Sequence, residues 1–218
     1  NLTTLKLSSY LLTHFDELEA STNIITLDFS GDNMTEFPVI PKFFVQIKEL
    51  ILDECYYLED LEGLANFPNI SYLVLSCCFE NERDLSWENP FPSLEVLRKL
   101  KQLKKLDLSS SEYHHYLSPV LFLENLNELI LQNGGTFNFP NEGIVYFPGE
   151  LPNFSGIATQ HKQSFIGSTS SSFGPESRLE KLTKLDLSYC EITNVDALAN
   201  LTNLNELVLN GCESLTNL

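Results

Sequence analysis

The stretch LEKLTKLDLSYCEITNVDALANLTNLNELVLNGCESL, residues 179–215, contains one phrase twice, 22 residues apart. Leu185 and Leu187 in the first copy correspond to Leu207 and Leu209 in the second. Alternate side chains of a strand face opposite sides, so both leucines of a pair point one way and the residue between them points the other way. The stretch therefore predicts two short strands with inward-facing leucines.

Similar pairs recur along the chain, and the steps between their first residues are 22, 23, 23, 33, 23, 56 and 22 residues. A period in this range indicates stacked repeats, because a single unit cannot bury its own leucines. The step of 33 holds one repeat plus about ten residues, and the step of 56 has room for a degenerate repeat and an insertion. The pairs begin at Leu5, Leu27, Leu50, Leu73, Leu106, Leu129, Leu185 and Leu207.

Apolar residues also follow the strands at intervals of three, as in Ile192, Val195, Leu198 and Leu201. Side chains eclipse every three residues in a 3₁₀ helix, so this spacing predicts a 3₁₀ or irregular turn. Parallel strands need a connection of about a dozen residues or more, which a unit of this length supplies. We therefore expect consecutive strands to join into one parallel sheet.

The units carry another apolar residue three positions before the pair, and most carry a small residue three positions after it. This pattern resembles the leucine-rich repeat, L-x-x-L-x-L-x-x-N/C, in the short subclass of phosphatase-regulator and internalin-type proteins. The match is close over 179–212 and fair over 1–78 and 103–133. The resemblance implies an α/β fold, a right-handed solenoid with a parallel sheet on its concave side and 3₁₀ or short helices on its convex side.

The domain organisation expected is one solenoid over 1–218, interrupted by irregular insertions at about 79–100 and 134–178. The chain lacks an initial Met, and neither end has the polar capping unit that stacked repeats need for solubility. We therefore expect a fragment of a longer repeat protein.

Composition argues against several classes of function. Thirty acidic residues against thirteen basic ones give a formal charge of −17, which disfavours a nucleic-acid partner. No apolar run reaches the length of roughly 18 residues that a membrane-spanning helix needs. Glycine-rich phosphate loops, nucleophile elbows and metal-ligand spacings are missing from the sequence, so we expect no enzyme, cofactor or metal site.

Four of the five cysteines, Cys55, Cys78, Cys190 and Cys212, follow a strand at the same position of the repeat. A small buried group suits that turn, and an unbridged cysteine packs as a small hydrophobe. Disulfides between neighbouring repeats are the alternative. The odd count fits a reducing compartment, cytoplasmic or nuclear. The five Asn-x-Ser/Thr sequons leave a secreted or cell-surface location open.

Outward-facing strand residues form the candidate binding surface. The pattern places Ile51, Val74 and Tyr72 side by side, with acidic residues around them, and exposed clusters of this kind are typical of protein-binding hot spots. The alternatives are that β-branched residues merely suit strands, or that an insertion covers them. The concave-face candidates are Glu49, Ile51, Asp53, Tyr72, Val74, Asp107, Ile130, Asp186 and Val208, and the loop candidates are Tyr56, Phe79 and Trp87.

The resemblance implies protein recognition, and we expect a monomer that binds a protein partner. Three settings remain open. The chain is an intracellular scaffold or regulatory subunit, a secreted or surface-displayed adhesion module, or the recognition arm of an enzyme such as a ligase or kinase.

Overall fold

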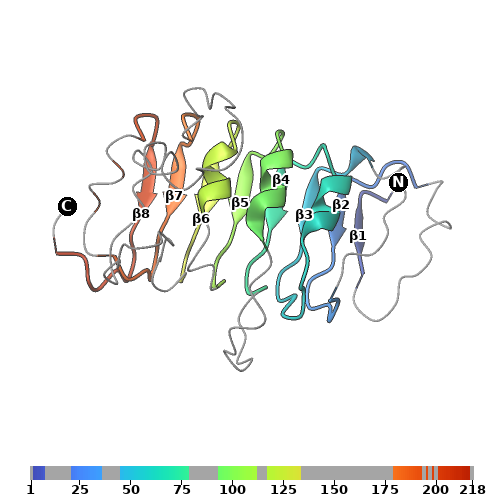
Figure 1. Cartoon of the computed structure of the whole chain (residues 1–218), viewed down its shortest axis with the longest axis horizontal. Helices are drawn as coiled ribbons and strands as arrows, with labels where there is room; N and C mark the ends of the chain where they lie inside the picture. Colours follow the sequence, from blue (N-terminus) through green and yellow to red (C-terminus); the bar gives the residue numbers. More distant parts are fainter. Residues whose placement is uncertain are drawn as a thin grey trace, which may run out of the picture.

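The computed structural model describes residues 2–7, 21–35, 45–78, 93–111, 117–133, 179–192, 195, 198 and 201–216. Within them, eight three-residue strands form one parallel sheet in the order of the chain, β1 to β8 (Figure 1). The strands are β1 (Thr4–Lys6), β2 (Thr26–Asp28), β3 (Glu49–Ile51), β4 (Tyr72–Val74), β5 (Lys105–Asp107), β6 (Glu128–Ile130), β7 (Lys184–Asp186) and β8 (Glu206–Val208).

The register between strands is the one that the repeat predicts. The middle leucine of each strand lies opposite the middle leucine of the next, from Leu5 to Leu207. The insertions between some repeats therefore change the length of the connection without shifting the strand that follows. The expected parallel solenoid is confirmed.

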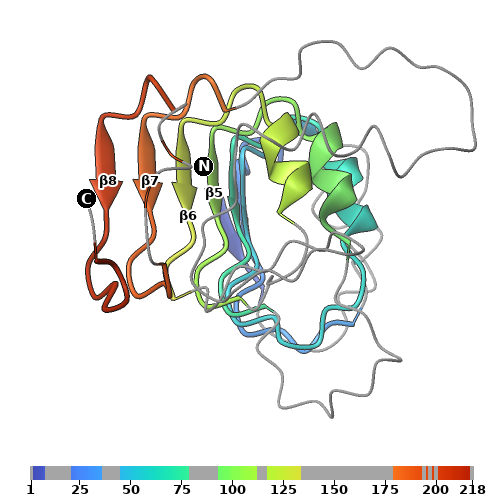
Figure 2. The same cartoon turned by 60° about the vertical axis from the view of Figure 1, so that its left-hand side comes forward.

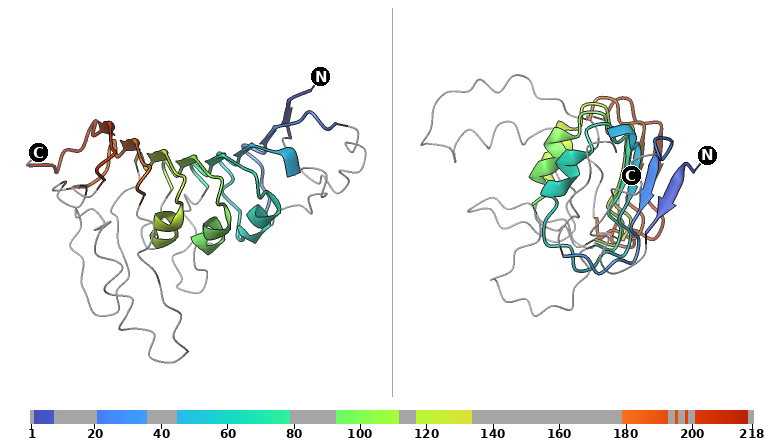
Figure 3. Two further views of the ribbon diagram at one scale, coloured as in Figure 1. Left: turned by 90° about the horizontal axis from the view of Figure 1, so that it is seen from above. Right: turned by 90° about the vertical axis from the view of Figure 1, so that its right-hand side faces the viewer.

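In the described part of the chain, three short 3₁₀ helices lie on the side away from the sheet: η3 (Glu62–Asn66), η4 (Leu94–Lys99) and η5 (Ser118–Phe122). Figure 2 shows them side by side, apart from the row of strands, and Figure 3 shows that the sheet lines the inner side of the bend. The predicted convex 3₁₀ turns are thus present in these repeats. The irregular stretch predicted at about 79–100 extends too far at its C-terminal end. Repeat structure has resumed by Leu94, because η4 belongs to the regular row of convex helices.

The spacing of three on the convex side has a direct structural cause. The Leu64 amide donates to the Leu61 carbonyl, and the Phe67 amide donates to the Leu64 carbonyl in turn. Each i to i+3 bond brings the next apolar side chain back to the same side, where Leu61, Leu64 and Phe67 are buried. Leu97, Leu100 and Leu103 repeat this chain of bonds in the η4 repeat.

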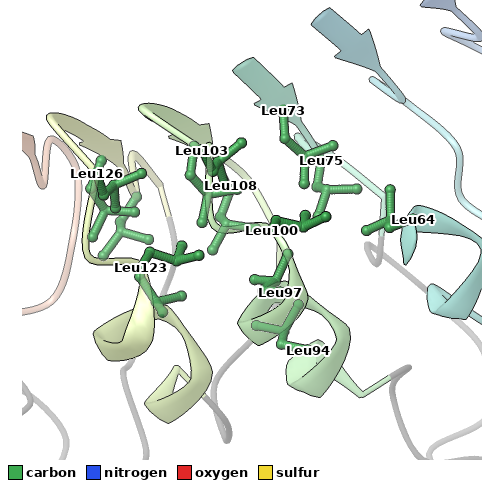
Figure 4. Close-up of a cluster of buried hydrophobic side chains, with 14 of the residues drawn as sticks. Leu64, Leu73, Leu75, Leu94, Leu97, Leu100, Leu103, Leu108, Leu123 and Leu126 are labelled. Carbon is green, nitrogen blue, oxygen red and sulfur yellow. The ribbon is translucent and has the colours of Figure 1, made fainter. Parts of the chain in front are cut away.

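The core is a slab of leucines between the sheet and the convex turns. Figure 4 shows Leu73 and Leu75 on the strand side, facing Leu94, Leu97 and Leu100 from the η4 repeat. These side chains are at most 1% exposed. The slab becomes less covered at its two ends, where Leu2 is 52% and Leu207 is 37% exposed, because the outermost strands have a neighbour on one side only.

The turns after β3, β4, β5, β7 and β8 are each held by a small side chain that donates to the preceding repeat. The Cys55 thiol donates to the Phe29 carbonyl, and the Ser111 hydroxyl donates to the Leu75 carbonyl at 2.7 Å. Cys78, Cys190 and Cys212 make the equivalent bonds to Leu52, Leu131 and Leu187. The small residue of the repeat is therefore both a packing group and a hydrogen-bond donor, and all five cysteines of the chain are thiols.

Asparagines join the repeats at the opposite end of the strands. The Asn69 side chain donates to the Val45 carbonyl at 2.9 Å, and Asn125 and Asn203 donate in the same way to Lys101 and Glu180. Each asparagine lies four residues before the middle of its strand. This structural role accounts for the asparagine of the sequon at 69.

Candidate functional site

Three parallel columns of side chains make up the outward face of the sheet. The register places the central column in the order predicted from the sequence, with Ile51 opposite Val74 and Val74 opposite Asp107. The leading column lies two residues before the central one in each strand, and the trailing column lies two residues after it. The central column is Lys6, Asp28, Ile51, Val74, Asp107, Ile130, Asp186 and Val208; the leading column is Thr4, Thr26, Glu49, Tyr72, Lys105, Glu128, Lys184 and Glu206; the trailing column is Ser30, Asp53, Ser76, Ser109, Gln132, Ser188 and Asn210.

The leading column is largely neutralised by its own side chains. Lys184 lies between two carboxylates, with its Nζ at 3.7 Å from Glu128 and 3.1 Å from Glu206. Lys105 binds Glu128 from the other side at 3.3 Å. The hydrogen bond that Lys184 donates to Glu206, followed by the attraction of the carboxylates, raises the pKa of Lys184. Four consecutive charges therefore form one chain of ion pairs along the face.

The same column holds two of the predicted site residues in intramolecular contacts. Glu49 accepts a hydrogen bond from the Thr26 hydroxyl at 2.9 Å. The Tyr72 ring lies under the Lys105 ammonium, 4.8 Å from the ring centre. Burial raises the pKa of the Tyr72 hydroxyl, and the nearby Lys105 opposes that shift only in part. Tyr72 is thus half-buried and held in place by its neighbour.

Aspartates of the central column bind the serines that follow them. Asp107 accepts the backbone amide of Ser109 at 2.9 Å, together with the Ser109 hydroxyl. Asp186 accepts the amide of Ser188 at the same distance. Each carboxylate therefore closes the turn after its strand. This role was missed in the sequence, although Asp-x-Ser recurs in three repeats, at 28, 107 and 186.

Asp28 makes the third of these turns and has a cation as well. Its carboxylate accepts the Ser30 amide at 2.9 Å and lies 3.1 Å from the Lys6 ammonium. Burial would raise the pKa of Asp28, but the hydrogen bonds from Ser30 and the attraction of Lys6 outweigh it and lower the pKa.

The apolar members of the central column differ in exposure. Ile51, Ile130 and Val208 are half-buried, whereas Val74 is only 7% exposed. Val74 was predicted to contribute an exposed contact, and this is wrong. Its short side chain lies in the middle of the sheet between Ile51 and Asp107, so neighbours on both sides limit its contact with solvent.

The remaining predicted residues divide into two groups. Asp53 binds the Ser76 hydroxyl across adjacent repeats, and Tyr56 is half-buried beyond β3. Phe79 and Trp87 lie outside the described residues, as does the predicted insertion at 134–178.

The described ranges contain no helix long and apolar enough to cross a membrane. They also contain no group of three or more histidine, cysteine or acidic side chains placed to hold a metal ion.

Comparison with known proteins agrees with this geometry. The family model "Leucine Rich repeats (2 copies)" matches residues 180–218. A protein of Arabidopsis thaliana named for disease resistance is 25% identical over 216 residues, which are 95% of this chain and 16% of that protein's length. The chain therefore spans about a sixth of this curated relative.

Two solved structures of Listeria monocytogenes proteins share the fold. The internalin InlF has a TM-score of 0.55 and 18% identity, with 94% of this chain and 47% of that chain covered. The internalin C2 has a TM-score of 0.56 and 20% identity, with 95% and 80% covered.

Proposed function

Because the chain is a leucine-rich-repeat protein, we propose that it is a recognition module that binds a protein partner on the concave face of its sheet. The binding surface comprises Ile51, Tyr72 and Ile130, with Val208 at its C-terminal end. The partner's side chains lie across the leading, central and trailing columns. Binding occurs without a chemical step.

One observation carries this proposal: apolar side chains remain half-exposed on a rigid, regular face. Ile51 and Ile130 project from strands whose backbones are bonded on both sides, so their positions are fixed before a partner arrives. Preformed apolar contacts lose little conformational entropy on binding. The half-buried Tyr72 adds an aromatic surface of the kind enriched in hot spots.

The electrostatics of the leading column support the same use. Its lysines and glutamates already bind one another, so a partner does not need to supply a counter-ion for each of them. Exposed ion pairs of this kind contribute little to stability, roughly 0–1 kcal/mol each, but they favour partners whose charges do not clash with them. We infer that the leading column contributes selectivity and that the isoleucines contribute affinity.

The test uses a random peptide library displayed on phage and selected against the purified, immobilised protein. Selected peptides are then measured against the variant Ile51→Asp/Ile130→Asp. A matched control, Glu62→Lys/Glu95→Lys, changes charge on two convex helices instead. We expect the concave variant to lose binding while its circular dichroism and unfolding midpoint stay close to those of the control. Peptides that bind the concave variant as well as the original protein would overturn the proposal.

The proposed compartment is reducing, cytoplasmic or nuclear, and the proposed working state is a monomer. Four cysteines use their thiols as donors to the preceding repeat, which favours a location where thiols stay reduced. Mass spectrometry of the protein from its native source would test this, because a secreted protein would carry glycans at the sequons. Light scattering in solution tests the monomer.

A second setting is favoured by one comparison. Nearly the whole chain aligns within a relative about six times its length, which is named for disease resistance. We therefore also propose that this solenoid serves as the recognition arm of a larger protein, with other activities carried outside residues 1–218. Expression of the full-length product and of residues 1–218 side by side would test whether both capture the same peptides.

A further inference from the structure

The two margins of the concave face carry different charge. In the leading margin, which comprises the five residues before the middle of each strand, the described lysines and glutamates nearly balance. They are Lys48, Lys101, Lys104, Lys105, Lys181 and Lys184 against Glu49, Glu124, Glu128, Glu180 and Glu206. The trailing side, from the central column to six residues past the middle of each strand, holds an acidic margin among the described residues. It comprises Asp32, Asp53, Glu54, Asp107, Asp186, Glu191 and Glu213, beyond the pair formed by Lys6 and Asp28.

The two margins also differ in the partners of their carboxylates. Glu128 and Glu206 bind lysines, and Glu124 lies 3.8 Å from Lys101. In the acidic margin, Asp53 binds the hydroxyl of Ser76, and Asp107 and Asp186 bind the turns that follow them. These donors are neutral, so they fix the position of each carboxylate without supplying a cation. Lys184 attracts Asp186 from the leading column, but its ion pairs are with Glu128 and Glu206.

The charge of the acidic margin follows the direction in which the repeats stack. Asp53 and Glu54 follow β3, Asp107 ends β5, and Asp186 and Glu191 belong to the β7 repeat. Neighbouring strands are about 4.8 Å apart, so the margin is an extended line of charge rather than a single point. A line of like charge beside a preformed apolar surface attracts an extended chain of the opposite charge and speeds its association.

We propose that the occupant of the concave face is a basic protein segment. Its apolar side chains contact Ile51, Tyr72 and Ile130, and its lysines or arginines bind the carboxylates of the acidic margin. The basic side chains of the segment face the acidic margin, because the balanced leading margin offers no equivalent line of acceptors. This inference rests on the proposed function and names the class of partner for the same face.

The experiment compares two variants that remove the same charge from opposite margins. The margin variant is Glu54→Gln/Glu191→Gln, two exposed residues that follow their strands. The control variant is Glu124→Gln/Glu180→Gln, two exposed residues that precede the middle of their strands and lie outside the three columns. Peptides from the phage library are sequenced for their net charge, and affinities of individual peptides are measured at low and physiological salt.

We expect the selected peptides to be enriched in lysine and arginine over the starting library. Their affinity should fall about tenfold in the margin variant, should change less than about twofold in the control, and should weaken as salt increases. Peptides without basic enrichment, or equal losses in the two variants, would overturn the basic-segment proposal.

Failure of this inference is separable from failure of the proposed function. Neutral or acidic peptides that still lose binding in Ile51→Asp/Ile130→Asp would leave the concave face as the binding surface and reject only the class of partner. Basic peptides that bind the Ile51→Asp/Ile130→Asp protein unchanged would reject both, because the acidic margin would then act without the face. A library that yields no binder at all would likewise reject both.

Discussion

The aromatic ring of Tyr189 lies against the backbone of Gly211, one repeat further along the chain. A Cβ atom at position 211 would come within 2.4 Å of the Tyr189 Cδ1 atom, well inside contact distance. Gly211 also has a φ of +68°, in the left-handed region. Both features follow from the solenoid, because residues at the same position of neighbouring repeats stack on one another.

Replacing Gly211 with alanine should therefore destabilise the protein for two reasons. The left-handed backbone costs about 1–2 kcal/mol for a residue with a Cβ atom, and the clash with the Tyr189 ring adds to that. We expect a lower midpoint of urea unfolding, measured by circular dichroism.

Gly31 provides the matched control for this substitution. It has a similar φ of +73°, but nothing lies within 4 Å of a Cβ atom built there. Gly31→Ala should cost the backbone term alone. In a Tyr189→Ala background, Gly211→Ala should cost about as much as Gly31→Ala; an undiminished penalty would show that the ring is not its cause.

The aspartate turns make a second prediction. Asp107→Ala removes the acceptor for the Ser109 amide and hydroxyl, and should lower the free energy of unfolding by roughly 1 kcal/mol. Asp107→Asn keeps an acceptor oxygen and should recover most of this loss. If both substitutions destabilise equally, the charge of Asp107, and not its hydrogen bonds, is what the turn requires.

Asp28 makes the stability depend on pH in a defined direction. Its pKa is lower in the folded protein than the ordinary value of 3.8, so the unfolded chain binds the proton more readily. Its contribution is therefore fully present above the unfolded pKa and is lost as pH falls through the folded pKa. The free energy of unfolding of Asp28→Asn should be lower than that of the original protein near neutral pH, and this difference should narrow as pH falls below about 4. A difference in unfolding free energy that does not change with pH would contradict this assignment.

Cys78 should resist alkylation in the folded protein. Burial raises the pKa of its thiol well above the ordinary value, and the neighbouring Cys55 raises it further. The thiolate, not the thiol, reacts with iodoacetamide. At pH 8 we expect the half-buried Cys77 and Cys212 to be labelled before Cys78, as followed by mass spectrometry. Equal labelling rates in the folded state would contradict the buried turn.

The sequence predicted most of the architecture because stacked repeats place equivalent residues in equivalent environments. Leu106 and Leu129 must share one environment if their units stack, and the register places them opposite each other. The same reasoning placed Asp107 beside Ile130 in the central column. Spacing alone also predicted the 3₁₀ turns, since i to i+3 bonds return each leucine to the core.

The details of the face were harder to predict, because they depend on contacts between columns. Nothing in the local sequence shows that Lys105 contacts both Tyr72 and Glu128, which are one repeat away in opposite directions. The burial of Val74 has the same origin in the strands on either side.

The left-handed turn residues were also missed. Glu54, Cys77, Ser110, Asn133 and Tyr189 have positive φ at the same position at which Gly31 and Gly211 occur. In the sequence, only the glycines indicated a left-handed residue at this position, and they occur in only two of the repeats described.

The central claim is that a partner lies on the concave face, and photo-crosslinking tests it most directly. A benzophenone amino acid replaces Ile130 in one protein and Glu95, on the convex side, in another, and each is irradiated with a selected peptide. The account predicts a covalent adduct from position 130 and none from position 95. An adduct from position 95, with none from position 130, would contradict it.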